Sequence, residues 1–389
     1  MKEPEMLVQV KDIVVRFYTY EGVVHALGGV NLCIQKGETL GLVGETGSGK
    51  SVTAFSILAL PPPPGKIESG EVLLSPNGQA IEILKLDRES LQDIRGHFIS
   101  MIMQEPSAAL NPLYTIGYQV SEVLLRHSLK KFIKIVLDKI EKDIEEAKNR
   151  GSRFRVWALN LEYGIYKAML KNAKSMRVRI ASKIPILRRY KRRLDSEVRK
   201  EVVGLLREMR ISDPEAAFDR YPHELSGGMQ QRAVIAMALA CRPKLLIADE
   251  PTTSLDVTIQ AQILDLIRNL KKEFGSSVLY ITHNLGVVAE ICDRVAVMYA
   301  GQVCETADVK ELFKRPLHPY TKALFDAIPR PGKGFVSIKG TVPNLVNPPT
   351  GCRFHPRCSK AMEVCSKEAP KLVEVRKNHF VACHLYPGD

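Results

Sequence analysis

Short apolar runs and alternating segments predict most of the strands in this chain. Near the N-terminus, alternation and β-branched residues predict three strands, at residues 7–10, 13–17 and 30–34. Turns are expected between them at Gly22, residues 28–29 and residues 36–37. Unbroken apolar runs predict strands buried on both faces of a sheet, at residues 40–43, 98–103, 244–249 and 278–283. Residues 295–305 predict two further strands around Gly301.

The middle of the chain follows a helical pattern instead. Between residues 117 and 210 apolar positions recur at helical spacing, most clearly at Ile133, Val136, Leu137, Ile140 and Ile144. Beyond a glycine at position 151, residues 154–194 interleave basic with apolar and aromatic side chains. The pattern as a whole predicts an α/β protein with a helical segment between two groups of strands.

The positive charge of the chain is confined to this helical segment. All 389 residues together carry a formal net charge of +13, but residues 130–200 alone hold 22 Lys or Arg against 8 Asp or Glu. The remainder is essentially neutral, so basicity is not a property of the whole protein. Two interpretations of the basic segment stay open: a solvated helical face or partner contact, and a surface for membrane or RNA.

Length and hydropathy limit the organisation of the chain. A chain of 389 residues is long for one domain, so we expect a large core domain with an appendage. No run approaches the roughly 18 apolar residues that a membrane-spanning helix needs. The first residues lack a basic segment followed by an apolar one. We therefore expect a cytoplasmic protein that meets a membrane through a partner.

A phosphate-binding loop is predicted between residues 40–43 and a helix that begins near Ser51. Gly44, Gly49, Lys50 and Ser51 fit the pattern G-x-x-x-x-G-K-[ST]. The glycines let successive N–H groups point into one concavity, where the helix dipole also favours a polyphosphate. Lys50 would reach the β- and γ-phosphates, and the Ser51 hydroxyl would bind Mg²⁺. The sequence therefore predicts binding of a nucleoside triphosphate.

Other polar residues follow predicted strands, where open α/β sheets bind ligands. Asp249 is placed to hold Mg²⁺, and Glu250 to orient and deprotonate a water. His283 ends another predicted strand, and beside a phosphate loop we expect it to contact the γ-phosphate. Ser226 precedes a helical run at residues 233–240, a second helix N-terminus suited to phosphate.

Together these motifs resemble the ATP-binding subunits of ABC transporters, over residues 7–128 and 197–389. The resemblance implies a P-loop NTPase of the α/β class, an ABC-type nucleotide-binding domain with a helical subdomain. It implies that Glu250 is the catalytic glutamate, His283 the switch histidine and Gln104 the Q-loop glutamine. Mg²⁺ would be held by Ser51, Gln104 and Asp249.

The same resemblance implies a set of nucleotide-binding residues. They are Phe17 (with Tyr18 as the alternative for stacking on adenine), Gly44, Glu45, Thr46, Gly47, Ser48, Gly49, Lys50, Ser51, Val52, Ser226, Gly227, Gly228 and the D-loop residue Asp256. Met229 stands where the ABC signature commonly has Gln, which is a mild departure.

The C-terminal tail narrows the resemblance to oligopeptide and dipeptide importers. The segments that resemble this family are residues 103–112, 318–324, 342–345 and 351–358. Four cysteines gather in the same tail, at Cys352, Cys358, Cys365 and Cys383. A small loop-rich segment needs a cross-link, such as a bound metal, to be stable. Four thiolates without a C-x-x-C pair favour a [4Fe–4S] cluster, which some members of the family carry. Zn²⁺ and free thiols are the alternatives.

The resemblance also implies an organisation and partners. We expect the ABC domain at residues 1–314, its helical subdomain at about 105–225 with a basic insertion at about 130–195, and a Cys-rich extension at residues 315–389. ATP hydrolysis in a head-to-tail dimer with a second homologous ATPase subunit would power peptide import. Two transmembrane permease subunits and an extracytoplasmic solute-binding protein would complete the assembly, at the cytoplasmic face of the membrane and without nucleic acid.

Two other functions are compatible with the same motor. One is an oligosaccharide importer of the peptide-transporter family. The other is a soluble ABC ATPase acting on DNA or ribosomes, with the basic insertion as its nucleic-acid surface. The importer-type tail argues against the second. The sequence does not identify the cargo, because the ATPase subunit does not touch it.

Overall fold

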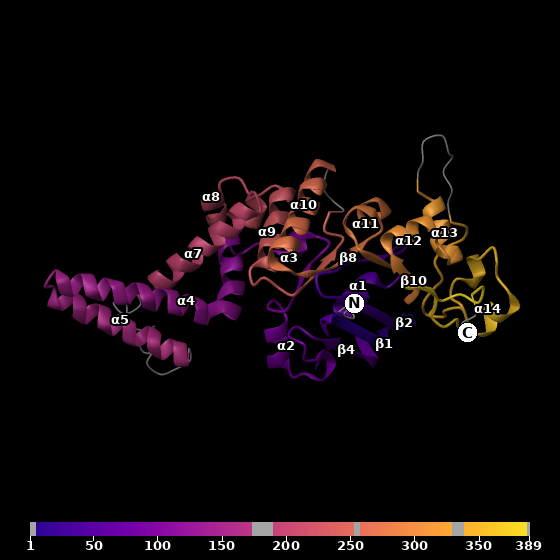
Figure 1. The fold of residues 1–389 in the computed structure, drawn as a ribbon, viewed down its shortest axis with the longest axis horizontal. Coiled ribbons are helices and arrows are strands. Elements are labelled where there is room, and N and C mark those ends of the chain that lie inside the picture. Colours follow the sequence, from indigo (N-terminus) through magenta and orange to yellow (C-terminus); the bar gives the residue numbers. More distant parts are fainter. Residues whose placement is uncertain (1–4, 173–189, 253–256, 329–337, 387–389) are drawn as a thin grey trace. The chain divides into compact units, whose positions relative to one another are not determined.

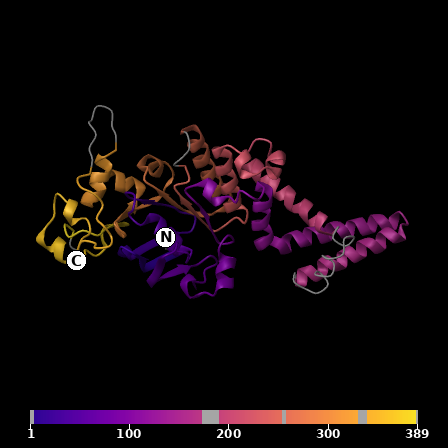
Figure 2. The ribbon, with the colours of Figure 1, turned by 180° about the vertical axis from the view of Figure 1, so that it is seen from behind.

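The computed structural model describes residues 5–172, 190–252, 257–328 and 338–386 (Figure 1). These residues form two compact units. Residues 1–104 with residues 242–389 make the first unit, and residues 105–241 make the second. Figure 2 shows the same ribbon from behind, and each unit is described below by itself.

An eight-stranded mixed sheet is the centre of the first unit, in the order β11-β12-β10-β9-β3-β8-β7-β6. Its strands are β3 (Thr39–Val43), β6 (Ile99–Ile102), β7 (Leu245–Asp249), β8 (Ser277–Thr282), β9 (Arg294–Tyr299), β10 (Gln302–Asp308), β11 (Val373–Arg376) and β12 (His379–Val381). The strands from β9 to β6 run parallel, and β10, β12 and β11 continue the sheet in antiparallel pairs. Every residue of β3, β7 and β8 is buried, as expected of strands covered on both faces.

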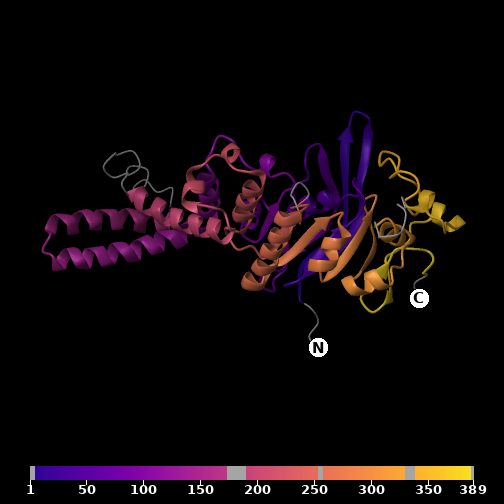
Figure 3. The same ribbon diagram turned by 90° about the horizontal axis from the view of Figure 1, so that it is seen from above.

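A second, antiparallel sheet has the order β2-β1-β4-β5. Its strands are β1 (Met6–Thr19), β2 (Gly22–Gln35), β4 (Gly65–Leu74) and β5 (Ile81–Glu82). The long β1–β2 hairpin stands out in the view of Figure 3. Alternate residues of β1, such as Val8, Val10 and Val15, are buried in one core with Leu42 of the large sheet and Ile57. The two sheets therefore share a hydrophobic core.

The first unit also contains helices and 3₁₀ turns. They are α1 (Lys50–Ile57), α2 (Arg88–Ile94), α10 (Val257–Phe274), α11 (Leu285–Ile291), α12 (Val309–Lys314), α13 (Pro319–Asp326) and α14 (Glu363–Lys367), with the 3₁₀ turns η1 (Ile83–Lys85) and η4 (His355–Arg357). The connection from β3 to α1 is the phosphate loop, so the predicted strand and helix on either side of it are confirmed.

The second unit is helical, as its periodicity predicts. Its elements are α3 (Pro106–Ala109), α4 (Ile116–Asn149), α5 (Arg153–Lys171), α7 (Tyr190–Glu208), α8 (Pro214–Asp219), η3 (Pro222–Glu224) and α9 (Gly227–Leu239). Helix α4 has a kink at Ser128 and packs against α5 and α7. Its predicted apolar stripe, from Ile133 to Ile144, is buried. None of the helices in the described parts of the chain is long and apolar enough to cross a membrane.

Two local predictions were wrong, and two strands were missed. Strand β2 continues through Gly28 and Gly29, where a turn was expected. Gly28 allows close packing there, because a Cβ on it would lie 2.7 Å from Arg353 Nη2, and its amide donates to the Gly301 carbonyl at 3.0 Å. Helix α9 begins at Gly227, earlier than the predicted run. The strands β11 and β12 were missed, and β12 joins the large sheet by pairing with β10.

Candidate functional site

The phosphate loop joins the carboxyl end of β3 to the first residue of α1, Lys50. Gly44 and Gly49 have φ values of 157° and 98°, in the region that favours glycine. A Cβ on Gly44 would lie 2.2 Å from the Met298 carbonyl oxygen, and one on Gly49 would lie 2.8 Å from Leu27 Cδ2. Crowding and backbone conformation both require glycine at these two positions.

The remaining loop residues differ in exposure. Thr46 and Gly47 are exposed at the tip of the loop, whereas Ser48 is buried. The Ser48 carbonyl accepts the Gly301 amide at 2.8 Å, which ties the loop to the β9–β10 turn. Val52, in the first turn of α1, is half-buried and packs against the hydrophobic core. The exposed tip leaves backbone groups of the loop accessible to a phosphate.

Lys50 lies over the loop that precedes it. Its ammonium donates to the carbonyl oxygens of Gly44 at 2.9 Å and Glu45 at 3.0 Å. Burial lowers the pKa of Lys50, and the nearby carboxylates of Glu250, Asp249 and Glu45 oppose that shift. The Lys50 ammonium thus binds neutral carbonyl oxygens. The charged oxygens of a polyphosphate would be stronger hydrogen-bond acceptors for it.

Asp249, the last residue of β7, lies beside Ser51 at the start of α1. The Ser51 hydroxyl hydrogen-bonds to its carboxylate, and burial raises the pKa of Asp249. Within the described chain the buried Oδ1 atom of Asp249 has no hydrogen-bond partner. A hydroxyl and a buried carboxylate with a free oxygen are hard oxygen ligands, so these residues fit Mg²⁺.

Three predicted residues meet at the ends of adjacent parallel strands. Gln104 follows β6, Glu250 follows β7 and His283 follows β8. The Gln104 amide donates to Glu250 Oε2 at 3.2 Å, and His283 Nδ1 lies 3.0 Å from Glu250 Oε1. The backbone of Glu250 is left-handed (φ 45°), and its amide donates to the Ile281 carbonyl. This strained turn directs the carboxylate between an amide and an imidazole.

Two aromatic residues near the end of β1 differ in their surroundings. Phe17 is half-buried and packs against the core. Gly65 lies against its ring, since a Cβ added to Gly65 would be only 2.9 Å from that ring. Tyr18 is 48% exposed, and its hydroxyl donates to Glu68 Oε1 at 2.9 Å. Phe17 therefore has the more restricted ring, and Tyr18 the more accessible one.

The signature segment lies in the second unit. Ser226 caps helix α9, and its hydroxyl accepts the Met229 amide at 3.4 Å. Ser226 and Gly227 are exposed, and Gly228 is half-buried. A Cβ on Gly227 would meet nothing within 4 Å, so the first turn of the helix is open to a ligand. Asp256, the predicted D-loop residue, lies outside the described residues.

The four clustered cysteines of the extension influence one another electrostatically. Burial raises the pKa of Cys352 to about 11, and the thiols of the other three cysteines contribute to this rise. Backbone N–H groups of Phe354, Lys360, Met362 and Leu385 bond to the sulfurs of Cys352, Cys358, Cys365 and Cys383, respectively. Yet no three His, Cys, Asp or Glu side chains in the described ranges are arranged as a metal site.

Two contacts of the extension were missed by sequence analysis. Arg357 forms an ion pair with Glu45 of the phosphate loop at 2.7 Å. Cys304 in β10 is buried and lies near Cys352 and Cys383. No local signal predicts the ion pair, because Arg357 and Glu45 are 312 positions apart in the sequence.

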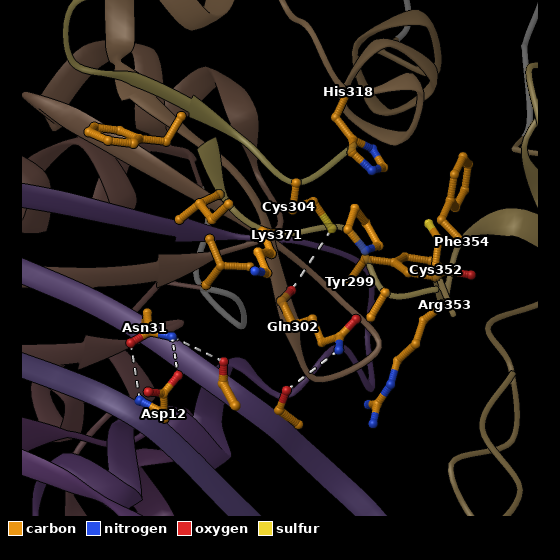
Figure 4. A pocket seen from close by; sticks show the side chains of 18 residues that line it. Asp12, Asn31, Tyr299, Gln302, Cys304, His318, Cys352, Arg353, Phe354 and Lys371 are labelled. Atoms are coloured by element: carbon orange, nitrogen blue, oxygen red, sulfur yellow. Dashed lines mark hydrogen bonds between the residues drawn. The ribbon is translucent and has the colours of Figure 1, made fainter. Parts of the chain in front are cut away.

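A cavity of about 620 Å³ lies between the extension and the two sheets (Figure 4). Cys304, His318, Cys352 and Arg353 line it, but no residue of the phosphate loop does. Polar groups on its wall pair with each other, as where Gln302 donates to the Gly28 carbonyl at 3.5 Å. This cavity is therefore separate from the nucleotide site.

Comparisons with known proteins agree with this geometry. Residues 27–253 match the model of the family "ABC transporter", and residues 304–365 match "Oligopeptide/dipeptide transporter, C-terminal region". The oligopeptide transport ATP-binding protein OppD of Bacillus subtilis is 41% identical, over 98% of this chain and 90% of that protein. The dipeptide transport ATP-binding protein DppD of the same organism is 40% identical, over 98% and 95%.

The fold also resembles that of a solved ATP-binding cassette. The TM-score is 0.54 with a dimeric cassette in a post-hydrolysis state bound to ADP and Pi. The match covers 78% of this chain and 99% of that structure, at 24% identity. At this identity the match speaks for the fold alone.

Proposed function

This chain belongs to the ABC transporter family, and we propose that it binds and hydrolyses ATP to power the import of di- or oligopeptides. Identity of about 40% to OppD and DppD over nearly the whole chain supports the peptide cargo. The match of residues 304–365 to the oligopeptide and dipeptide C-terminal region supports it independently.

The observation that carries the catalytic part is the contact of Gln104, Glu250 and His283 at adjacent strand ends. In the proposed reaction Glu250 orients a water that attacks the γ-phosphorus. The bond from the γ-phosphorus to the bridging oxygen breaks, ADP leaves, and Glu250 accepts the water proton. Gln104 and His283 hold the Glu250 carboxylate, and Lys50 neutralises phosphate charge.

Mg²⁺ would be held by Ser51, Asp249 and Gln104 beside the phosphates. When bound it supplies positive charge that offsets the charge on the transferred phosphoryl group. The Asp249 carboxylate, already bonded to the Ser51 hydroxyl, keeps that hydroxyl oriented toward the site.

A second subunit would complete each site. The exposed first turn of α9, with Ser226, Gly227 and Gly228, supports a role in capping the γ-phosphate of a partner. Asp256 would join the same interface. We propose a head-to-tail dimer with a homologous ATPase, bound to two permease subunits at the cytoplasmic face of the membrane and supplied by an extracytoplasmic solute-binding protein.

Substitution of the proposed base tests the catalytic part. Glu250→Gln keeps the shape of the side chain but cannot accept a proton, so ATP hydrolysis should fall about 100-fold or more while ATP binding persists. Glu71→Gln is the control, since Glu71 is an exposed residue of β4. Phosphate release and ATP binding are measured in parallel. Unchanged hydrolysis in Glu250→Gln would remove this residue from the role.

The cargo is tested in the assembled transporter. Permease subunits and the solute-binding protein are reconstituted with this chain, and ATP hydrolysis is measured with peptides and with oligosaccharides. Stimulation by peptides supports the proposal, and stimulation by oligosaccharides alone would replace it.

We also propose a [4Fe–4S] cluster on Cys352, Cys358, Cys365 and Cys383, with Zn²⁺ as the alternative. The backbone N–H bonds to all four sulfurs support it, because such bonds stabilise thiolates bound to iron. Iron and sulfide are measured on protein purified without oxygen. Cys365→Ser should lose iron, whereas Cys241→Ser, in the second unit, should not. Colourless wild-type protein without iron would contradict the cluster.

A further inference from the structure

The C-terminal extension holds the phosphate loop at Glu45. The guanidinium of Arg357 binds the Glu45 carboxylate at two points, with Nη1–Oε2 at 2.7 Å and Nη2–Oε1 at 3.1 Å. The Arg357 side chain is 5% exposed and that of Glu45 is 25% exposed. A two-point pair with so little solvent is more directional than a surface ion pair.

The backbone of Glu45 is held as well. Its amide donates to the hydroxyl of Tyr320 at 2.9 Å, and Tyr320 is fully buried in α13. Its carbonyl accepts from Lys50 at 3.0 Å. One residue of the loop thus connects the extension to the lysine proposed to bind phosphate.

Arg357 is itself fixed by the extension. Its Nε donates to the Lys339 carbonyl at 2.8 Å, and its Nη1 donates to the Tyr299 hydroxyl at 3.2 Å. The hydrogen bonds to Glu45 raise the pKa of Arg357, so the guanidinium stays charged. A second arginine of the same motif, Arg353, donates to the Ala300 carbonyl beside the loop.

We propose that Arg357 and Tyr320 are positioning residues for ATP binding, an inference that rests on the proposed function. The loop binds a polyanion, and an unpaired Glu45 carboxylate within it would repel phosphate. Arg357 neutralises that carboxylate and holds it away from the phosphates. Tyr320 fixes the peptide of Glu45, which keeps the adjoining carbonyl aligned with Lys50.

The charge argument is tested by a pair of substitutions. Arg357→Gln should weaken binding of Mg²⁺-ATP about tenfold or more, measured by equilibrium dialysis of the full-length chain. Adding Glu45→Gln removes the unpaired carboxylate, so the double variant should recover most of the lost affinity. A merely structural role for Arg357 would not give this recovery.

A matched control lies in the same extension. Arg376 pairs with Glu311 at 3.1 Å on an exposed face, and Arg376→Gln should leave ATP affinity unchanged. If wild-type protein binds no ATP, the proposed function fails. If wild-type protein binds ATP and Arg357→Gln binds it equally well, only the present inference fails.

A third variant avoids dependence on the folding of Arg357→Gln. Tyr320→Phe keeps the ring and removes the acceptor of the Glu45 amide, so ATP affinity should fall about threefold to tenfold. Glu45→Gln alone removes the carboxylate that Arg357 neutralises, so it should bind ATP more tightly than Arg357→Gln does. Binding by Glu45→Gln that is as weak as binding by Arg357→Gln would overturn the charge argument.

A different observation, in the second unit, carries a second proposal. At the tip of the α4–α5 hairpin, Phe154 and Trp157 are 78% and 62% exposed, with ring centroids 6.0 Å apart. Leu161, 43% exposed, follows one turn later on the same side of α5. The opposite side of α5 carries the buried Leu159 and Tyr166.

Positive charge surrounds these aromatic residues. Residues 147–161 contain four basic side chains and no acidic one. Lys148, Arg153 and Trp157 line a hollow of about 480 Å³ at this tip. Exposed Trp and Phe among Lys and Arg are typical of segments that lie in the headgroup region of a bilayer.

We propose that the hairpin tip binds the surface of an anionic membrane. The aromatic rings would enter the interface between headgroups and acyl chains, while the basic side chains pair with lipid phosphates. Charge complementarity selects this occupant, because an apolar protein groove would not require the surrounding basic residues.

Trp157 makes this proposal easy to test, because it is the only Trp among the 389 residues. Its fluorescence should shift to shorter wavelength with phosphatidylglycerol–phosphatidylcholine vesicles, but not with phosphatidylcholine alone. Arg155→Glu should reduce vesicle binding about tenfold. Lys134→Glu makes the same charge reversal at an exposed residue of α4 away from the tip, and should not reduce binding. No shift, or a shift only when permease is in the vesicles, would overturn the proposal.

Discussion

Charged side chains are used differently in the first unit and in the helical second unit. The first unit includes a fully buried charged pair where the extension joins the large sheet, His379 with Glu305, although other pairs of the extension are exposed. In the helical unit they are exposed, as in Lys131 and Glu201, with 55% and 37% of their side chains accessible. Buried charges fix where elements lie, whereas exposed pairs contribute little to stability individually.

The excess positive charge of the chain belongs to the helical unit. Several basic residues of the helical unit pair with acidic neighbours, as Arg193 does with Asp143 at 2.7 Å and Glu162 at 3.1 Å. This part of the basic segment fits a solvated helical face. The hairpin tip differs, because residues 147–161 combine exposed aromatic rings with four basic side chains and no acidic one.

The largest effect should follow removal of Glu305. Its carboxylate accepts the amides of Leu317 at 2.7 Å and His318 at 2.9 Å, and His379 Nε2 at 2.7 Å. Glu305→Ala leaves these groups buried without an acceptor, which should destabilise the extension by about 3–5 kcal/mol. Hydrogen exchange of the segment with Leu317 measures it.

Glu311→Ala is the control for that substitution, since Glu311 is a partly exposed residue that pairs with Arg376 at 3.1 Å and with Arg315 at 4.0 Å. Its effect should stay within about 0.5 kcal/mol. If the two variants show equal protection from exchange, burial of the carboxylate does not determine how much it contributes to stability.

A pH dependence of intermediate size is expected from His318. Burial lowers the pKa of His318 to about 4, with Glu305 opposing and Lys322 adding to the shift. Since an unfolded histidine has a pKa near 6.5, the unfolded chain binds more protons between about pH 6.5 and 4. The contribution of neutral His318 is therefore complete above about pH 6.5 and lost as the pH falls toward 4.

The loss should reach about 3 kcal/mol at the acid end of this range. Exchange protection of the extension is followed from pH 7.5 to 4.5, after correction for intrinsic rates. In His318→Gln the acid-induced decrease should be smaller. A decrease of the same size in that variant would assign it to other groups.

The smallest effects are expected in the helical unit. Arg193→Met removes two partners from a side chain that is 34% exposed, and should destabilise the packing of α4 against α7 by about 1 kcal/mol. Lys131→Met breaks the single exposed pair with Glu201 and should change stability by less than about 0.5 kcal/mol. Exchange of α4 amides compares the two, and a larger loss for Lys131→Met would reverse the ranking.

Local spacing was enough to predict the parts of the nucleotide site that lie within one segment. The phosphate loop follows from Gly44, Gly49 and Lys50, because a tight turn, a helix start and a cation are encoded by neighbouring residues. The carboxylates Asp249 and Glu250 were predicted because they end an apolar run. The helical unit followed from its periodicity.

Contacts between residues far apart in the sequence were decided by the tertiary structure alone. Parallel pairing of β6, β7 and β8 brings Gln104, Glu250 and His283 together. The glycine pair in β2 was mistaken for a turn, because the approach of the β9–β10 turn leaves no local pattern. Arg357 meets Glu45 because the extension, whose strand β12 pairs with β10, packs on the loop. Local sequence sets backbone conformation over a few residues, whereas these partners are chosen by the packing of whole elements.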